Sequence, residues 1–139
     1  MPEKKKKTDL IIGADHAGFE MKETIQRLLS ALKIHWEDAG TFSKDSVDYP
    51  DIAFKVAEAV KSGRARRGIL VCGTGVGMSM AANKVPGIRA ALCNDLFTAR
   101  MARAHNNANI LTIGSRVIGP GLAEMIVRTF LETPFEKGR

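Results

Sequence analysis

The feature that most constrains the fold of this chain is a regular alternation of short apolar runs with amphipathic segments. The first run, 9–14, reads Asp-Leu-Ile-Ile-Gly-Ala, and such continuous hydrophobicity is typical of a strand buried on both faces of a parallel sheet. The following segment, 19–32, places apolar residues at helical spacing with charged residues between them. The beginning of the chain therefore predicts a buried strand that leads into a helix with one apolar stripe.

This strand–helix unit is repeated to the end of the chain. Each helix returns the chain to the same edge of the sheet, so repeated crossovers imply parallel strands. The predicted fold is a three-layer α/β/α sandwich around a five-stranded, parallel, doubly wound (Rossmann-like) sheet. Strands are predicted over 9–14, 34–38, 68–72, 89–93 and 109–113, and helices over 19–32, 52–61, 78–83, 95–105 and 122–131.

Length and charge place further limits on the protein. The 139 residues fit one domain, assigned to 9–139, after a basic tail, 1–8, that is predicted to be disordered. Four of the six net positive charges belong to the lysines at 4–7, and no aromatic residue is interleaved with them, so no nucleic-acid partner is predicted. The apolar run 10–14 is too short for a signal peptide or a membrane span, as are later runs. We expect a soluble, cytoplasmic protein with no membrane partner.

The cysteines and histidines do not form a recognisable metal site. The chain has two cysteines, Cys72 and Cys93, which do not form a Cys-x-x-Cys pair. Its three histidines, His16, His35 and His105, lack the spacing of zinc ligands. The sequence therefore predicts no disulfide framework, no metal and no cofactor.

Polar or glycine-rich residues follow three of the predicted strands, at 15–16, 72–77 and 114–116. Ligands of open parallel sheets bind beyond the carboxyl ends of the strands, so these segments are the candidates for a site. His105 and Asn106 are also polar neighbours, but they precede the fifth strand instead of following it.

Cys72 ends an apolar run and is followed by glycines, whereas Cys93 has no such loop after it. A thiol at the end of a strand faces the N–H groups at the start of the next helix, which favour a thiolate. We interpret Cys72 as a reactive group and Cys93 as a small apolar residue of the core.

The segment 73–77 reads Gly-Thr-Gly-Val-Gly and lets backbone N–H groups approach an anion without interference from Cβ atoms. The anion is either a phosphate or an oxyanion. The spacing differs from the dinucleotide-binding fingerprint, because Met78 stands where the third glycine would be, and no lysine follows as in a P-loop. A phosphatase loop would also need an arginine near the cysteine, where Met78 and Ser79 stand.

The histidines differ in their surroundings. His35 falls within a predicted strand and is interpreted as a structural histidine. His16 follows Asp15 in a turn at the end of a strand, and His105 precedes Asn106, so these two have polar partners suited to a site.

Taken together, these motifs resemble the ribose-5-phosphate isomerase B family over about 10–139. No single motif is specific, but their joint occurrence in this order is. The matching motifs are Gly-Ala-Asp15-His16-Ala-Gly-Phe, Asp48-Tyr49-Pro50, Cys72-Gly-Thr-Gly-Val-Gly-Met-Ser79, Ala82-Asn83-Lys84, His105-Asn106 and Gly114-Ser-Arg116.

The resemblance implies an aldose–ketose isomerase of the pentose phosphate pathway that interconverts ribose 5-phosphate and ribulose 5-phosphate. Cys72 would move a proton between C2 and C1 through a cis-enediolate, with Thr74 assisting. His105 would help to open the furanose ring, with Asp15 nearby. Proton abstraction next to a carbonyl needs a base and a preorganised anion stabiliser, and the glycine loop supplies the second.

The resemblance also implies how a sugar phosphate is bound. His16 and Arg116 would bind the phosphate, Asn106 a sugar hydroxyl, and Arg139 the phosphate in a neighbouring subunit, so a homodimer or homotetramer with shared sites is expected. Family members usually continue beyond this arginine with another basic phosphate ligand. The complete set of implied substrate-binding residues is His16, Tyr49, Gly73, Gly75, Val76, Gly77, Asn106, Arg116 and Arg139.

Two other functions fit the same motifs. A hexose-phosphate isomerase of the same family, acting on allose 6-phosphate or galactose 6-phosphate, would share the chemistry but need a longer pocket. A nucleotide-binding α/β module would use 73–77 for a nucleotide phosphate and leave Cys72 as packing. Activity with pentose and hexose phosphates, or stabilisation by nucleotides, distinguishes them.

Overall fold

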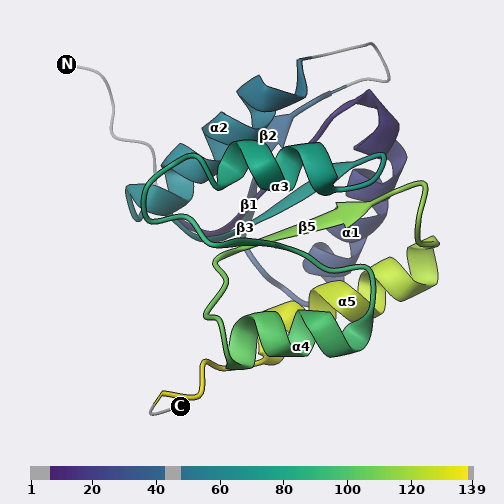
Figure 1. The fold of residues 1–139 in the computed structure, drawn as a ribbon. Coiled ribbons are helices and arrows are strands. Elements are labelled where there is room, and N and C mark those ends of the chain that lie inside the picture. The colour runs from purple at the N-terminus through teal and green to yellow at the C-terminus, as the bar shows by residue number, and fades with distance from the viewer. Residues whose placement is uncertain (1–6, 43–47, 138–139) are drawn as a thin grey trace.

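The computed structural model describes residues 7–42 and 48–137. Within these ranges the chain forms a five-stranded sheet and five α-helices (Figure 1). The strands are β1 (Thr8–Ala14), β2 (Trp36–Gly40), β3 (Ala65–Cys72), β4 (Ala90–Leu92) and β5 (Ile110–Gly114). The helices are α1 (Phe19–Ala31), α2 (Tyr49–Lys61), α3 (Val76–Ala82), α4 (Leu96–Ala104) and α5 (Pro120–Glu132), and a short 3-10 turn, η1 (His16–Gly18), precedes α1.

The sheet is parallel throughout, with the strand order β2-β1-β3-β5-β4. Helices α2 and α3 pack on one face, and α1, α4 and α5 pack on the other (Figure 1). The predicted three-layer, doubly wound α/β/α architecture is therefore confirmed.

The core consists of two apolar layers that the sheet separates. Successive side chains of a strand point to opposite faces, so Ile11 packs with α2 and α3 while Ile12 packs with α1 and α5. Both isoleucines are fully buried, and each such burial stabilises the fold by roughly 1.5–3 kcal/mol. Double-sided burial explains why the strands read as continuous apolar runs rather than as alternating patterns.

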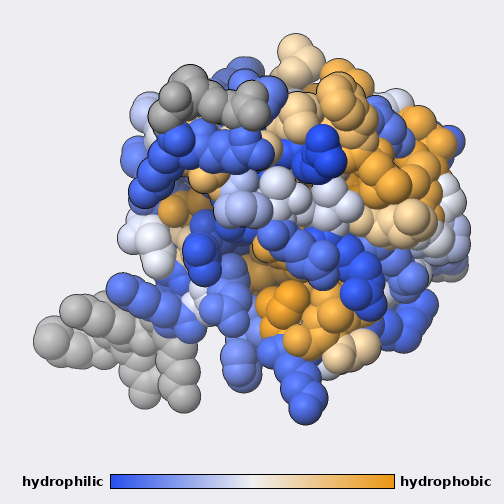
Figure 2. All heavy atoms as spheres, turned by 90° about the horizontal axis from the view of Figure 1, so that it is seen from below, coloured by the Kyte–Doolittle hydropathy of each residue, from blue (hydrophilic) through white to orange (hydrophobic). Residues whose placement is uncertain are grey.

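Apolar side chains also remain exposed, and orange areas interrupt the polar surface in the view of Figure 2. Among the described residues, the large apolar side chains with more than a third of their surface exposed include two groups, besides Phe42, Tyr49 and Phe54. One group lies on α3, β4 and α4 and comprises Val76, Met80, Leu92 and Phe97; a second lies at the start of α5 and just before it, and comprises Val117, Leu122 and Met125.

Several boundaries differ from those predicted. Strand β3 begins at Ala65, three residues before the predicted start at 68. The prediction starts late because Arg66 and Arg67 interrupt the apolar pattern, although both belong to the strand and Arg67 pairs with Leu10. Helix α2 begins at Tyr49 instead of 52, since Pro50 is compatible with a first helical turn. Helix α3 begins at Val76 instead of 78.

Two further assignments change at the amino-terminal edge of the sheet. Residues 1–6, most of the predicted basic tail, lie outside the described residues, and Thr8 already belongs to β1, where it pairs with Ala65. His35 was expected inside a strand as a structural histidine, but it is exposed and precedes β2, so that interpretation is wrong. Ile34 and His35 form the approach to the strand, where the chain is not yet covered by helices.

Candidate active site at the carboxyl edge of the sheet

The register of the three central strands brings the predicted site segments together. Ala14 at the end of β1 pairs with Val71, and Cys72 at the end of β3 pairs with Gly114 at the end of β5. The segments that follow β1, β3 and β5 therefore leave the sheet side by side at one edge. This is the edge at which open parallel sheets bind their ligands.

Cys72 is the last residue of β3, and its side chain is 6% exposed. Its Sγ accepts a hydrogen bond from the backbone N–H of Gly75 at 3.0 Å. A backbone N–H directed at sulfur stabilises negative charge there, as a reactive thiolate requires. The sulfur therefore lies at the sheet edge, where Cys72 belongs to the apolar layer beneath α2 and α3 and its Sγ faces the glycine loop that follows β3.

Gly75 makes this hydrogen bond possible because its position admits no side chain. Its φ is 85°, a left-handed conformation that residues with a Cβ rarely adopt. A Cβ at this position would also lie 2.4 Å from Cδ1 of Leu92 and 3.0 Å from the carbonyl carbon of Ile113. The loop thus folds back over Cys72 only with glycine at this position.

The segment after β5 holds the glycine loop from the other side. The N–H of Ser115 donates to the carbonyl of Cys72 at 2.8 Å, and the N–H of Arg116 donates to the carbonyl of Gly73 at 3.0 Å. The exposed Arg116 side chain lies against Gly73, since a Cβ on that glycine would be 3.7 Å from Nη1 of Arg116. A guanidinium therefore stands beside the loop, where it can bind an anion.

The turn after β1 supplies a carboxylate and an imidazole to the same edge. The backbone N–H of Asp15 donates to the carbonyl of Val71 at 3.2 Å, which places Asp15 beside the end of β3. Its carboxylate Oδ1 accepts from the N–H of Gly18 at 3.0 Å and caps η1, which leaves His16 exposed on the surface. The Oγ of Ser115 donates to the carbonyl of Ala17 at 2.8 Å and ties this turn to the segment after β5.

Tyr49 and Thr74 complete the group at this edge. The ring of Tyr49 lies against Gly77, because a Cβ on that glycine would be 3.0 Å from Cε2 and Cζ of the tyrosine. Thr74 is exposed in the loop, and its Oγ1 accepts from the N–H of Val76 at 3.2 Å. Both hydroxyl-bearing residues therefore lie at the loop and helix start that follow Cys72.

His105 and Asn106 lie at the other edge of the sheet. After β4 ends at the carboxyl edge, the nine residues of α4 carry the chain back by about 14 Å, and the exposed His105 follows the end of that helix. Within one chain, the fold thus brings Asp15, His16 and Cys72 together but not His105. Arg139 lies outside the described residues.

Asn94 is a residue of this edge that sequence reasoning did not assign to the site. Its Oδ1 accepts from the N–H of Gly114 at 3.1 Å, while Asp95 caps α4 by accepting from the N–H of Thr98 at 2.7 Å. The signal in the sequence is its position directly after the predicted strand 89–93. Asn94 fixes the end of β5 opposite Cys72.

Cys93 is 1% exposed and packs in the core, as predicted. Burial raises the pKa of its thiol, a hydrogen bond with Thr98 lowers it in part, and the nearby Asp95 carboxylate raises it. The net effect is a raised pKa of the Cys93 thiol, which disfavours a thiolate at this position.

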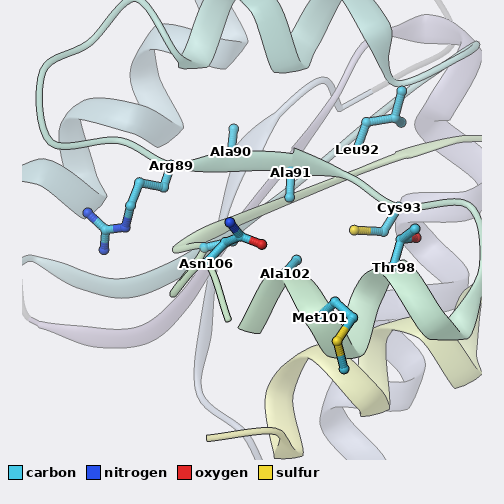
Figure 3. A pocket seen from close by; sticks show the side chains of 10 residues that line it. Arg89, Ala90, Ala91, Leu92, Cys93, Thr98, Met101, Ala102 and Asn106 are labelled. Atoms are coloured by element: carbon cyan, nitrogen blue, oxygen red, sulfur yellow. The ribbon is translucent and has the colours of Figure 1, made fainter. Parts of the chain in front are cut away.

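A cavity of about 390 Å³ opens between β4 and α4 (Figure 3). Its lining is mainly apolar and includes Cys93, Met101 and Ala102, with Arg89 and Asn106 toward one end. Cys72 does not line it. The hydrogen-bonded residues described above, rather than this cavity, mark the candidate active site.

Across 7–42 and 48–137, no group of three or more metal-ligating side chains is close enough to hold an ion. No helix in the same ranges is long and apolar enough to cross a membrane.

A family model described as Ribose/Galactose Isomerase matches residues 10–139. This chain belongs to that family. Ribose-5-phosphate isomerase B of Escherichia coli is 46% identical to it over 130 residues, which cover 94% of this chain and 87% of that protein. D-erythrulose-4-phosphate isomerase of Pectobacterium atrosepticum is 44% identical over 134 residues, which cover 93% of this chain and 86% of that protein.

Solved structures lead to the same ribose/galactose isomerase family. The structure of Clostridium thermocellum ribose-5-phosphate isomerase B matches with a TM-score of 0.93 at 53% identity, covering 94% of this chain and 88% of that chain. The resemblance drawn from the sequence motifs is therefore confirmed. As a member of this family, the chain is a sugar-phosphate isomerase.

Proposed function

We propose that this sugar-phosphate isomerase interconverts ribose 5-phosphate and ribulose 5-phosphate through a cis-enediolate, with Cys72 as the base. The observation that carries the proposal is the position of Cys72 Sγ, which accepts a hydrogen bond from the backbone N–H of Gly75 within the glycine loop 73–77. Relatives named as ribose-5-phosphate isomerase B support the choice of a pentose phosphate.

The proposed reaction moves hydrogen between neighbouring carbons without net oxidation. The Cys72 thiolate takes the proton from C2 of the open-chain aldose, and the electrons of that bond form the enediolate double bond between C1 and C2. The thiol then returns a proton to C1, while a proton passes from the C2 oxygen to the C1 oxygen. Thr74 assists this second transfer, and the amides of 73–77 stabilise the charge on oxygen.

Substrate binding is assigned to the residues around the base. His16 and Arg116 bind the phosphate, since a ring N–H of imidazole and the planar guanidinium fork both donate to phosphate oxygens. Tyr49 borders the sugar on the side of Gly77. The wider proposed set is Gly73, Gly75, Val76, Gly77, Asn106 and Arg139, with Asn106 on a sugar hydroxyl and Arg139 on the phosphate of a neighbouring site.

A second copy of the chain completes the proposed site. His105 is the proposed acid or base of ring opening, and Asp15 of another subunit is proposed to lie near it. Within its own chain, His105 lies at the opposite edge of the sheet from Cys72. The exposed Val76 and Met80 of α3 lie beside the glycine loop and offer an apolar face for a partner. A homodimer packed there lets one subunit supply Cys72 and the other His105.

The substrate assignment is tested by comparing turnover of ribose 5-phosphate, allose 6-phosphate, galactose 6-phosphate and D-erythrulose 4-phosphate on purified protein. We expect the highest kcat/KM with ribose 5-phosphate. A higher value with a hexose phosphate or with D-erythrulose 4-phosphate overturns the pentose assignment but leaves the reaction type intact. Stabilisation by a nucleotide, with no turnover of any sugar phosphate, contradicts both.

A further inference from the structure

A buried arginine at the amino-terminal edge of the sheet has no part in the chemistry proposed above. Arg103 lies in the last turn of α4 and is 5% exposed, which is unusual for a charged side chain. Its guanidinium lies 5.9 Å from the centre of the Phe130 ring. A buried guanidinium costs stability unless its N–H groups find acceptors, so the acceptors of Arg103 indicate which segments it stabilises.

The acceptors of Arg103 belong to two segments far apart in the sequence. Nη1 donates to Oδ1 of Asn107 at 3.0 Å and to the carbonyl of Ala108 at 2.7 Å. Nε donates to the carbonyl of Thr133, just after α5, at 3.2 Å. One rigid fork thus joins the turn after α4 to the start of the C-terminal segment.

The first of these segments is the turn that carries His105 and Asn106. Asn107 has a φ of 50°, a left-handed conformation that asparagine tolerates better than most residues. From its other side, Nε of Arg89 donates to the carbonyl of Asn107 at 2.7 Å. Arg103 and Arg89 therefore both hydrogen-bond to Asn107, two residues after the proposed ring-opening histidine.

The contacts of Arg103 are made to neutral oxygens. Burial lowers the pKa of its guanidinium, and the positive charges of Arg66 and Arg89 lower it further. The geometry of the planar fork, which a lysine cannot reproduce, is the property that this position uses.

We propose that Arg103 is a positioning residue for the isomerase site, holding His105 and Asn106 where a second subunit uses them. The inference rests on the proposed function, because it assigns Arg103 a role through the ring-opening histidine. Arg103 itself touches no reacting atom in this account. Its loss is expected to impair ring opening and to leave proton transfer at Cys72 intact.

Arg67 is a matched control that the fold provides. Its guanidinium lies 5.8 Å from the centre of the same Phe130 ring, and its Nη1 donates to the carbonyls of Phe130 at 3.1 Å and Leu131 at 3.2 Å. It shares the packing and the helix end with Arg103 but contacts neither the turn at 105–108 nor Thr133. R103K therefore removes hydrogen bonds to the turn at 105–108, whereas R67K leaves those bonds in place.

The experiment measures kcat and KM for ribose 5-phosphate in wild type, R103K and R67K, with thermal unfolding of each. A misplacement of about 1 Å costs on the order of 10²-fold in rate, so we expect that loss in kcat for R103K. R67K should stay within about threefold of wild type at a comparable unfolding temperature. Equal losses of kcat in the two variants would overturn the proposal.

A second readout separates positioning of the histidine from general damage. Ribulose 5-phosphate cannot close a furanose ring, because its C5 oxygen carries the phosphate, so its reaction needs no ring opening. Loss of a deuterium label from C1 of this ketose should proceed in R103K within about threefold of wild type, as it should in H105A. If the label loss falls as far as the turnover of ribose 5-phosphate, the positioning role through His105 is wrong.

The two proposals fail in different ways. A wild-type protein that turns over no pentose phosphate contradicts the proposed function, whatever the variants do. In that case amide hydrogen exchange still tests whether Arg103 anchors the turn at 105–108. The exchange is followed at Asn106 and Ala108, whose N–H groups donate to the carbonyls of Met101 and Ala102. Faster exchange in R103K than in R67K supports the anchoring, and equal exchange contradicts it.

Discussion

The Sγ of Cys72 accepts the backbone N–H of Gly75 at 3.0 Å, across a loop that leaves the sheet and turns back on itself. This relationship joins the proposed base to the loop that stabilises the enediolate. A change that displaces Gly75 therefore alters both the hydrogen bond to sulfur and the direction of the neighbouring donors.

Replacing Gly75 by alanine is expected to reduce both stability and turnover. The new Cβ would lie 2.4 Å from Leu92 and 3.0 Å from the carbonyl carbon of Ile113, at a φ of 85°. Left-handed strain alone costs about 1–2 kcal/mol, and the overlap adds to it. Gly63 has a similar φ of 81° with nothing near its missing Cβ. In denaturation assays G63A should therefore be destabilised by the left-handed strain alone, and in turnover assays it should keep full activity. Equal losses of stability and turnover in G75A and G63A would contradict the role of Gly75.

Lys22 is expected to stabilise the end of β2 and the residues directly after it, Thr41 included. It is 1% exposed, and its Nζ pairs with Asp38 at 2.6 Å and donates to the carbonyl of Thr41. The Lys22 side chain is 1% exposed and that of Asp38 is 28% exposed, so removing the carboxylate leaves a buried ammonium without its counter-charge, and D38N should unfold at lower urea concentration than wild type. K55M removes an exposed lysine that donates to Ala39 at 3.3 Å and should cost under about 1 kcal/mol. A loss in D38N no larger than that in K55M would show that the buried pair contributes little.

Cys93 is expected to make stability fall at alkaline pH. Because burial raises the pKa of this thiol above its ordinary value of 9.0, the folded state holds the proton that the unfolded state releases. The contribution is therefore complete below the ordinary thiol pKa and is lost as pH rises through the higher value. Thermal unfolding of wild type and C93A between neutral pH and pH values above that of a free thiol measures it. A parallel decline in the two proteins would contradict the assignment to Cys93.

A shared site predicts that two inactive variants restore activity when their subunits are mixed. C72A and H105A should each be nearly inactive as homodimers. A mixed dimer contains one site in which Cys72 and His105 are both intact, so random reassembly should recover about a quarter of wild-type turnover. The measurement is the rate of ribulose 5-phosphate formation after the variants are unfolded together and refolded. If mixed dimers form but turnover does not recover, the shared site is contradicted. Either Cys72 and His105 of the same chain then act in one site, or one of the two residues has no part in it.

The sequence predicted the layers of the fold better than their ends. Continuous apolar runs such as that around Ile11 and Ile12 identify strands buried on both faces, and this follows from local composition. Arg66 and Arg67 concealed the beginning of β3, because charged residues interrupt the local apolar pattern, although the Arg67 side chain packs on Phe130 at the end of α5.

The candidate site was predictable only where function follows a strand end. Asp15, His16, Cys72 and Arg116 meet at the carboxyl edge because parallel strands end together. The hydrogen bond of Asn94 to Gly114 depends on tertiary register, which no local pattern encodes. The separation of His105 from Cys72 likewise follows from the direction of α4 and required the structure.

Turnover of ribose 5-phosphate by C72A, with C93A as the matched cysteine control, tests the central claim most directly. The account predicts that C72A folds with a thermal transition close to wild type and loses at least about 10³-fold in kcat, because no other group replaces the base. C93A should retain turnover within about threefold. A folded C72A protein that turns over ribose 5-phosphate at a rate near wild type would contradict the assignment of Cys72 as the proton-transferring base.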